Sequence, residues 1–233
     1  MRWAHPAHGL LYPDTFLPLA EQTGLMRQLT LVVLQTALRQ GQAWRHAGLD
    51  LPVAVNLSVA NLLDAHLVRE VGDLLAGFGL PARALELELT EDTLMADPVR
   101  SKQVLADLRA LGVRLAVDDY GTGYSSLAYL QELAVDELKL DKSFVIRMTE
   151  DDGAAAIVRT TVDLAHSLGL TMVAEGVETD AALTELARLG CEVAQAYFIS
   201  KPLPAEELTG WLQTRIQPLP AQPADTPVTG IRS

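Results

Sequence analysis

Cysteine, long apolar runs and basic residues are all scarce in this sequence, and each scarcity excludes a class of protein. The single cysteine, Cys191, cannot form an internal disulfide and suits a reducing compartment, so we expect a cytoplasmic protein. No apolar stretch approaches the roughly 20 residues of a membrane-spanning helix. The opening residues, MRWAHPAHG, also lack the apolar core of a signal peptide. The sequence therefore predicts no membrane segment.

The charge balance is acidic, with 18 lysines and arginines against 30 aspartates and glutamates and a formal net charge of −12. This balance argues against binding to duplex nucleic acid or to an anionic membrane surface. A small anionic ligand held through metal ions remains compatible with it, because a bound divalent cation dominates its local field. Hydrophobic residues make up 49% of the chain, which is enough for a substantial buried core.

Strand-like apolar runs alternate with amphipathic helical segments along most of the chain. Six runs occur, at residues 51–58, 84–90, 114–120, 136–141, 171–177 and 192–198. Helical patterns cover residues 13–47, 67–79, 97–112, 153–169 and 180–190. Alternation of this kind predicts an α/β fold with a parallel sheet and helices outside it.

The composition changes near the C-terminus. We expect one domain over residues 1–215, followed by a tail over residues 216–233 that is rich in proline and small polar residues and has no periodicity. Such a composition is typical of disorder.

Each of the six apolar runs ends in, or just after, a polar group able to bind metal or exchange protons. In chain order these groups are Asn56, Glu88, Asp118 with Asp119, Lys139, Glu175 and Gln195. Six strands are compatible with an open doubly wound sheet or with most of an eight-stranded barrel. In a barrel the carboxyl ends of parallel strands meet at one rim, where barrel enzymes place their chemistry. In an open sheet the same groups would spread along a line.

The run LELELT, residues 85–90, favours the barrel. Its leucines alternate with Glu86 and Glu88, so the leucines share one face of a strand and the glutamates share the other. Carboxylates on a covered sheet face are unfavourable unless a cation pairs with them. An edge strand with solvated glutamates is the alternative, and five other polar strand ends make it the weaker interpretation.

The polar set is rich in oxygen ligands and contains no histidine. Its four carboxylates (Glu88, Asp118, Asp119, Glu175) and one amide (Asn56) are the ligands that Mg²⁺ or Mn²⁺ prefer, whereas zinc normally recruits His or Cys. Two metals about 3.5–4 Å apart, bridged by a carboxylate, recur in phosphodiester hydrolysis. Adjacent aspartates suit such a site, and Lys139 would hold a water or a phosphoryl oxygen there.

Simpler interpretations exist for each motif taken alone. Two aspartates before GTG are most often a turn or a helix cap. The segment AEGVET is compatible with a strand, a turn and a cap at Thr179, and a lysine after a strand is usually solvated.

Seven motifs together resemble the EAL domain of bacterial cyclic di-GMP phosphodiesterases. In the family's order they are RWAHPAHGLLYPDTFLPLAEQTGL, VNLS, ELTE, VDDYGTGYSSL, LKLDKSFV, VAEGVET and SKPLP. The resemblance runs from Arg2 to about Leu212. It implies a modified (β/α)8 barrel of the TIM type.

The resemblance also implies roles for individual residues. Asn56, Glu88, Asp118, Asp119 and Glu175 match metal-ligand positions, and Glu88, Lys139 and Glu175 match positions of the catalytic machinery, with Lys139 placing the attacking water. Arg2 and Gln195 match substrate-binding positions. Glu91 matches a glutamate that anchors the loop of residues 120–126, in which Tyr120 replaces the usual phenylalanine.

Two further departures from the family pattern concern the N-terminus and Ala196. The Glu-Ala-Leu tripeptide that names the family would stand just before Met1, so its metal-ligand glutamate and the first two barrel strands are expected to be absent from this chain. Ala196 follows Gln195 where the family usually has glycine, and its methyl group would crowd backbone near the site.

By resemblance, the chain is expected to hydrolyse cyclic di-GMP to linear pGpG with Mg²⁺ or Mn²⁺ at a two-metal site. The first alternative is an inactive module that binds cyclic di-GMP, because the first metal-ligand glutamate is missing. A metal-dependent barrel enzyme acting on another phosphoester is the second. The family also leads us to expect a homodimer and an upstream regulatory or GGDEF domain.

Overall fold

The computed structural model describes residues 1–123, 127–197 and 200–215, and the chain divides into two compact units, residues 1–201 and 202–233. The predicted tail, residues 216–233, lies outside the described residues. Within the second unit the structure describes one helix, α11 (Ala205–Arg215). Across the described ranges no helix combines the length and hydropathy that a bilayer crossing requires.

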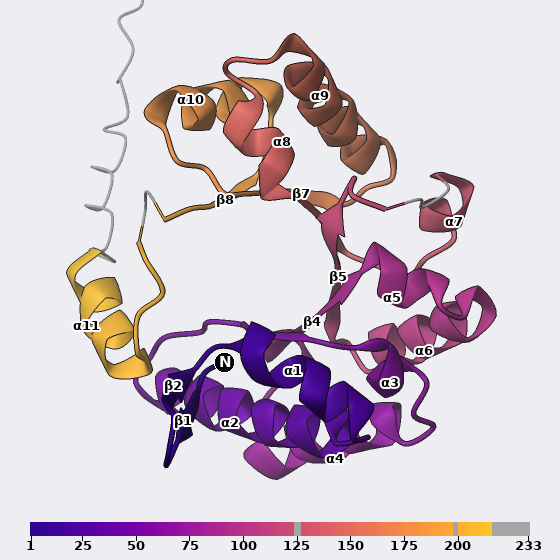
Figure 1. Ribbon diagram of the computed structural model, residues 1–233, viewed down its shortest axis with the longest axis vertical. Helices are drawn as coiled ribbons and strands as arrows, with labels where there is room; N and C mark the ends of the chain where they lie inside the picture. The colour runs from indigo at the N-terminus through magenta and orange to yellow at the C-terminus, as the bar shows by residue number, and fades with distance from the viewer. Residues whose placement is uncertain (124–126, 198–199, 216–233) are drawn as a thin grey trace, which may run out of the picture. The chain divides into compact units, whose positions relative to one another are not determined.

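The centre of the first unit is a parallel sheet whose strands follow chain order. The strands are β3 (Val53–Asn56), β4 (Leu85–Thr90), β5 (Arg114–Tyr120), β6 (Glu137–Leu140), β7 (Thr171–Glu175) and β8 (Val193–Gln195). Each strand pairs only with its neighbours in the chain, so the order never reverses as it would in a doubly wound sheet. The sheet curls into a half-barrel, which confirms the predicted α/β fold of the TIM-barrel type (Figure 1).

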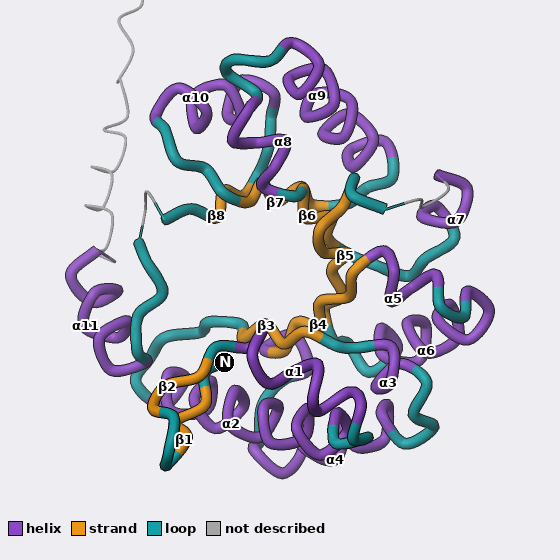
Figure 2. The backbone as a smooth tube through the Cα atoms, viewed as in Figure 1, coloured by secondary structure: helices purple, strands orange, loops and turns teal. Residues whose placement is uncertain are grey.

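Helices cover the convex face of this sheet (Figure 2). The longer ones are α1 (Pro13–Gln22), α2 (Met26–His46), α4 (Leu67–Phe78), α6 (Pro98–Ala110), α9 (Asp152–Ser167) and α10 (Asp180–Leu189). The shorter ones are α3 (Val59–Leu62), η1 (Ala82–Ala84), α5 (Glu91–Met95), α7 (Leu127–Gln131) and α8 (Lys142–Arg147). The longer helices confirm the predicted helical patterns.

The core lies between the sheet and these helices. In β4, Leu85, Leu87 and Leu89 are fully buried and belong to the core cluster. Because strand residues alternate between the two faces, Glu86 and Glu88 point to the concave side. β4 pairs with β3 on one side and β5 on the other, and both glutamates are buried, so the alternative of an edge strand with solvated glutamates is wrong.

A two-stranded antiparallel hairpin precedes the helices and was absent from the predicted elements. It consists of β1 (Trp3–His5) and β2 (Gly9–Leu11). Trp3 lies edge-on against Phe16 of α1, with 5.8 Å between the ring centroids. This contact ties the hairpin to the first helix.

Candidate active site

The polar strand ends converge on the concave side of the sheet around one buried ammonium group. Lys139, near the end of β6, is 4% exposed. Its Nζ lies 2.8 Å from Glu88 Oε1, 3.0 Å from Asp118 Oδ1 and 2.7 Å from Glu175 Oε1. These partners come from β4, β5 and β7, so the lysine joins four strands. The simpler interpretation of a solvated lysine is therefore wrong.

Asn56 adds a fifth strand, β3, to this cluster. It ends β3, in register with Glu88 on β4, and its Nδ2 donates a hydrogen bond to Glu88 Oε2 over 3.1 Å. Both oxygens of Glu88 are thus engaged, one by the amide and one by Lys139. The amide oxygen of Asn56 remains available as a ligand for a cation.

A backbone irregularity brings the two adjacent aspartates to the same place. The β5–β6 register shifts between Val117 and Tyr120, and Asp119 has a φ of 53°, in the left-handed region. In a regular strand, Asp118 and Asp119 would point to opposite faces. A bulge re-aims one of them, and carboxylate oxygens of Asp118, Asp119 and Glu175 lie within 4.8 Å of one another.

These three carboxylates form a group able to hold a divalent cation, and Glu88 and Asn56 stand beside it. Four carboxylates here face one ammonium group, so the cluster carries a surplus of negative charge that a hard cation would neutralise. Oxygen donors of this kind fit Mg²⁺ or Mn²⁺. The aspartates lie within β5, well before α7 begins at Leu127, so the helix-cap interpretation is wrong.

Burial dominates the electrostatics of the cluster. It raises the pKa of Glu88 and Glu175, and the neighbouring Lys139 only partly offsets that rise. Burial, followed by the charge of Asp118, also raises the pKa of Asp119. For Lys139 burial acts in the opposite direction, but Glu88, Glu175 and Asp118 together raise its pKa above the ordinary value. Lys139 therefore remains charged at neutral pH.

Glu91 holds the segment that follows the aspartates. It is the first residue of α5 and is 4% exposed. Its Oε2 accepts the N–H of Gly123 over 2.8 Å and its Oε1 accepts the N–H of Gly121 over 3.4 Å. A Cβ on Gly123 would lie 2.3 Å from Glu91 Oε2, so glycine is needed for this approach.

Replacing Glu91 by alanine should free these two amides. We expect the N–H groups of Gly121 and Gly123 to exchange with solvent at least about tenfold faster, because each loses its buried acceptor. Hydrogen exchange followed by NMR measures this. Asp92→Ala removes an exposed carboxylate from the same helix and is the matched control. Equal exchange in the two variants would show that Glu91 does not anchor this segment.

The end of β7 depends on a glycine next to the site. Gly176 follows Glu175 and has a φ of +68°. A Cβ there would lie 2.4 Å from Lys142 Cβ and 3.3 Å from Lys142 Cα, at the start of α8. A side chain at this position would push β7 and α8 apart.

Gly176→Ala should therefore lower the free energy of unfolding by about 3 kcal/mol, from the left-handed backbone and the steric clash together. Gly169→Ala is the control, because Gly169 has a φ of +71° and no neighbouring atom within 4 Å of the place where a methyl group would lie. This control should lose only about 1 kcal/mol. Urea denaturation of both variants measures the difference, and equal losses would exclude the clash.

Two predicted substrate contacts lie outside this contact network. Gln195 ends β8 in register with Glu175, and it is exposed. Arg2 is exposed at the hairpin, with its guanidinium 5.1 Å from the centre of the Tyr12 ring. Thr179 caps α10, because its side chain accepts the N–H of Ala182, and this part of the simpler interpretation of AEGVET is confirmed. Glu175 in the same motif nevertheless contacts Lys139 in the cluster.

Sequence reasoning missed the charged layer beneath the site and the acidic neighbour Asp141. Asp141 caps α8 through the N–H of Ser143, and its charge adds to the raised pKa of Asp119. Glu86, Arg114 and Glu137 form the lower layer. The alternation in LELELT and DELKLD already contained a signal for that layer, since residues two apart in a strand share a face.

A half-barrel of parallel strands with an oxygen-rich cluster and a buried lysine at its carboxyl edge defines the class: a TIM-barrel-type α/β protein with its site at the strand ends. A family model described as "EAL domain" matches residues 1–202. The chain belongs to the EAL domain family.

Relatives and solved structures agree with this assignment. The chain is 46% identical over 209 residues to the bifunctional diguanylate cyclase/cyclic di-GMP phosphodiesterase MucR of Pseudomonas aeruginosa, covering 89% of this chain and 30% of the relative. It is 45% identical over 214 residues to the cyclic di-GMP phosphodiesterase NbdA of the same organism, covering 91% and 27%. The chain thus spans less than a third of the length of these curated relatives.

A solved structure described as PaMucR phosphodiesterase in complex with c-di-GMP superimposes with a TM-score of 0.85 at 46% identity. It covers 89% of this chain and 84% of that one.

Proposed function

We propose that this chain hydrolyses one phosphodiester bond of cyclic di-GMP to give linear pGpG, with Mg²⁺ or Mn²⁺ held at a two-metal site. The observation that carries the proposal is the convergence of Glu88, Asp118, Asp119 and Glu175 around Lys139 at one edge of the sheet. Relatives named as cyclic di-GMP phosphodiesterases, at 45–46% identity, support the substrate.

In this proposal the carboxylates and Asn56 hold the cations. When bound, the cations would supply the positive charge that activates a water and stabilises the phosphoryl oxygens. Hydrolysis adds that water's oxygen to phosphorus, breaks the bond from phosphorus to one ribose oxygen, and returns a proton to the leaving oxygen. The acidic cluster would otherwise repel the substrate phosphate, so the cations must be in place first.

In this scheme Lys139 is the residue of the chain that acts directly on the reacting groups, beside the cations. Its ammonium group donates from the centre of the cluster, and it stays charged because three carboxylates surround it. From that position it would orient the attacking water or a phosphoryl oxygen. Arg2 and Gln195 would bind the dinucleotide, and Glu91 would keep the segment after Asp119 in place.

The test incubates the purified 233-residue chain with cyclic di-GMP and Mg²⁺ or Mn²⁺ and follows pGpG by chromatography. We expect product only with metal, and none from Glu88→Gln, which removes a ligand charge and a partner of Lys139. Binding of cyclic di-GMP without metal-dependent product would contradict hydrolysis and leave a cyclic di-GMP-binding module.

We extend the proposal to assembly and location. The greater length of the relatives supports action beside a regulatory or GGDEF domain. We also propose that the chain forms a homodimer and that it is located in the cytoplasm. The free Cys191 suits the reducing conditions of that compartment. Light scattering of the purified chain and fractionation of cells that express it test these two points.

A further inference from the structure

A second charged layer lies beneath the site, on the same concave side of the sheet. Glu86 stands two residues before Glu88 on β4, and Glu137 stands two residues before Lys139 on β6. Residues two apart in a strand share a face and are about 6.6–6.8 Å apart along it. The lower layer therefore lies two residues before the site along β4 and β6, on the same face of the sheet.

One arginine serves both buried carboxylates of this layer. Arg114, at the start of β5, lies in register with Glu86, and its Nε is 3.7 Å from Glu86 Oε2. Its guanidinium also forms a close ion pair with Glu137. Glu86 and Glu137 are 9% and 6% exposed, so little of either carboxylate meets solvent and Arg114 supplies their counter-charge.

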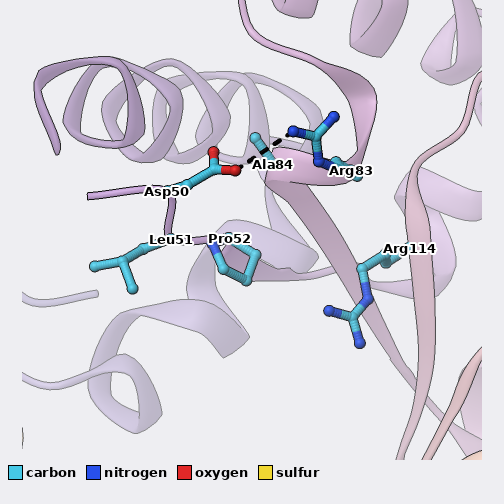
Figure 3. Close-up of a pocket in the computed structure, with 6 residues that line it drawn as sticks. All are labelled: Asp50, Leu51, Pro52, Arg83, Ala84 and Arg114. Atoms are coloured by element: carbon cyan, nitrogen blue, oxygen red, sulfur yellow. Dashed lines mark hydrogen bonds and ion pairs between the residues drawn. The ribbon is translucent and has the colours of Figure 1, made fainter. Parts of the chain in front are cut away.

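Arg114 also lines a cavity of about 200 Å³ at the amino ends of the strands, together with Asp50, Leu51, Pro52, Arg83 and Ala84. Figure 3 shows Arg83 directed at Asp50, a pair that spans 3.4 Å, with Arg114 lying apart from it. The two arginines share the cavity but not their partners. Arg83 is consequently a matched control for the charge of Arg114.

We propose that Arg114 is a positioning residue for the site above it. It binds Glu86 and Glu137, and the ammonium group of Lys139 therefore stays with the site carboxylates. Without Arg114, the uncompensated Glu137 lies on the same strand and face as Lys139, whose four-carbon stem can turn toward it. The inference rests on the proposed function, because the site must hold cations and turn over substrate.

Loss of Arg114 should therefore affect cation binding and turnover in opposite directions. The field at the site becomes more negative and the site carboxylates lose part of their counter-charge, so divalent cations bind more tightly. Lys139 is drawn from its place, so turnover at saturating metal falls. A merely structural role would weaken cation binding and turnover together.

The experiment compares Arg114→Met with Arg83→Met in the full chain. Mn²⁺ binding is titrated by electron paramagnetic resonance, and kcat for cyclic di-GMP is measured at saturating Mn²⁺. For Arg114→Met we expect the Kd for Mn²⁺ to fall about fivefold and kcat to fall at least about tenfold. Arg83→Met should change neither by more than about twofold.

Two further variants separate charge from folding. Arg114→Lys keeps the charge and should retain the Kd for Mn²⁺ of the wild type. In the Arg114→Met background, Glu137→Gln removes the uncompensated carboxylate and should restore most of the lost kcat, a coupling that a double-mutant cycle measures. Weaker Mn²⁺ binding in Arg114→Met, or no restoration by Glu137→Gln, overturns the inference. No Mn²⁺ binding in the wild type overturns the proposed function instead, and the inference with it.

Discussion

Replacing Lys139 by methionine is expected to abolish nearly all turnover. It should also destabilise the protein when no metal is bound, and divalent cations should restore most of that stability. The variant removes the one ammonium group that lies within 3.0 Å of carboxylate oxygens from Glu88, Asp118 and Glu175. We expect kcat to fall about a thousandfold, the scale of losing a charged group aimed at the reacting atoms. Methionine keeps most of the length of the lysine side chain and carries no charge, so the change is chiefly electrostatic.

Removing one partner of a buried ion pair is strongly destabilising, because the other charges remain without compensation. We expect the metal-free variant to lose about 3 kcal/mol in the free energy of unfolding near neutral pH. Mn²⁺ should restore most of this loss by binding the folded state alone. The rise in Tm on adding Mn²⁺ should therefore be larger for the variant than for the wild type.

The loss should also shrink as the pH falls. Burial raises the folded-state pKa of Glu88 and Glu175 above the unfolded value. A carboxyl with a raised folded pKa contributes stability that is fully present below the unfolded pKa and is lost as the pH rises through the folded pKa. Without Lys139 both folded pKa values rise further, so wild type and variant should converge in stability toward about pH 4.

Lys102→Met is the matched control for this prediction. Lys102 is a more exposed lysine on α6 that pairs with Glu132 and lies over the ring of Tyr129. Its loss should change the free energy of unfolding by at most about 1 kcal/mol. If Lys139→Met behaves like this control in denaturant titrations, the buried cluster is not held by the lysine.

The sequence allowed the sheet and most of its polar edge to be predicted, because both follow from local patterns. Six apolar runs correspond to β3 through β8, and glycines at the ends of predicted helices hold left-handed caps, as Gly79 and Gly190 do for α4 and α10. Polar groups at the strand ends predicted the cluster around Lys139 because parallel strands share one carboxyl edge.

What the sequence left out depends on contacts between distant segments. The β1–β2 hairpin has strands of three residues each, too short for a period of two to stand out, and it is tied to α1 by Trp3. The left-handed backbone at Asp119 depends on the β5–β6 register. Taken alone, Glu86 fitted an edge strand as well as a buried layer, and what decides between them is the pairing of β4 with strands on both sides and the contact of Glu86 with Arg114 on β5.

Asp119→Asn is expected to separate the ligand role of this residue from its backbone role. Asparagine is among the few residues that tolerate the left-handed region, so the φ of 53° and the bulge should persist. Only the charge is lost. Loss of outer-shell partners already weakens metal binding about 10–100-fold, so loss of a direct ligand should weaken Mn²⁺ binding about a hundredfold or more. We expect kcat to fall about a thousandfold with it.

The metal-free stability of the same variant should rise at neutral pH. Burial, then Asp118, Asp141 and Glu175, raise the pKa of Asp119, so its ionised form is unfavourable in the folded state. Asparagine carries no charge, and its advantage should be present above the raised folded pKa and vanish as the pH falls toward the unfolded value, where the wild-type carboxyl is protonated. Thermal unfolding with a chelator, repeated across pH, measures this trend.

Asp119→Ala completes the test, because alanine removes the same charge but does not favour the left-handed backbone. It should bind Mn²⁺ as weakly as Asp119→Asn and be about 1 kcal/mol less stable than that variant. If the two variants are equally stable, the left-handed backbone at Asp119 is not strained in the folded protein. If Asp119→Asn keeps the wild-type Kd for Mn²⁺, Asp119 is not a ligand, and the bulge serves only to aim Asp118 at Lys139.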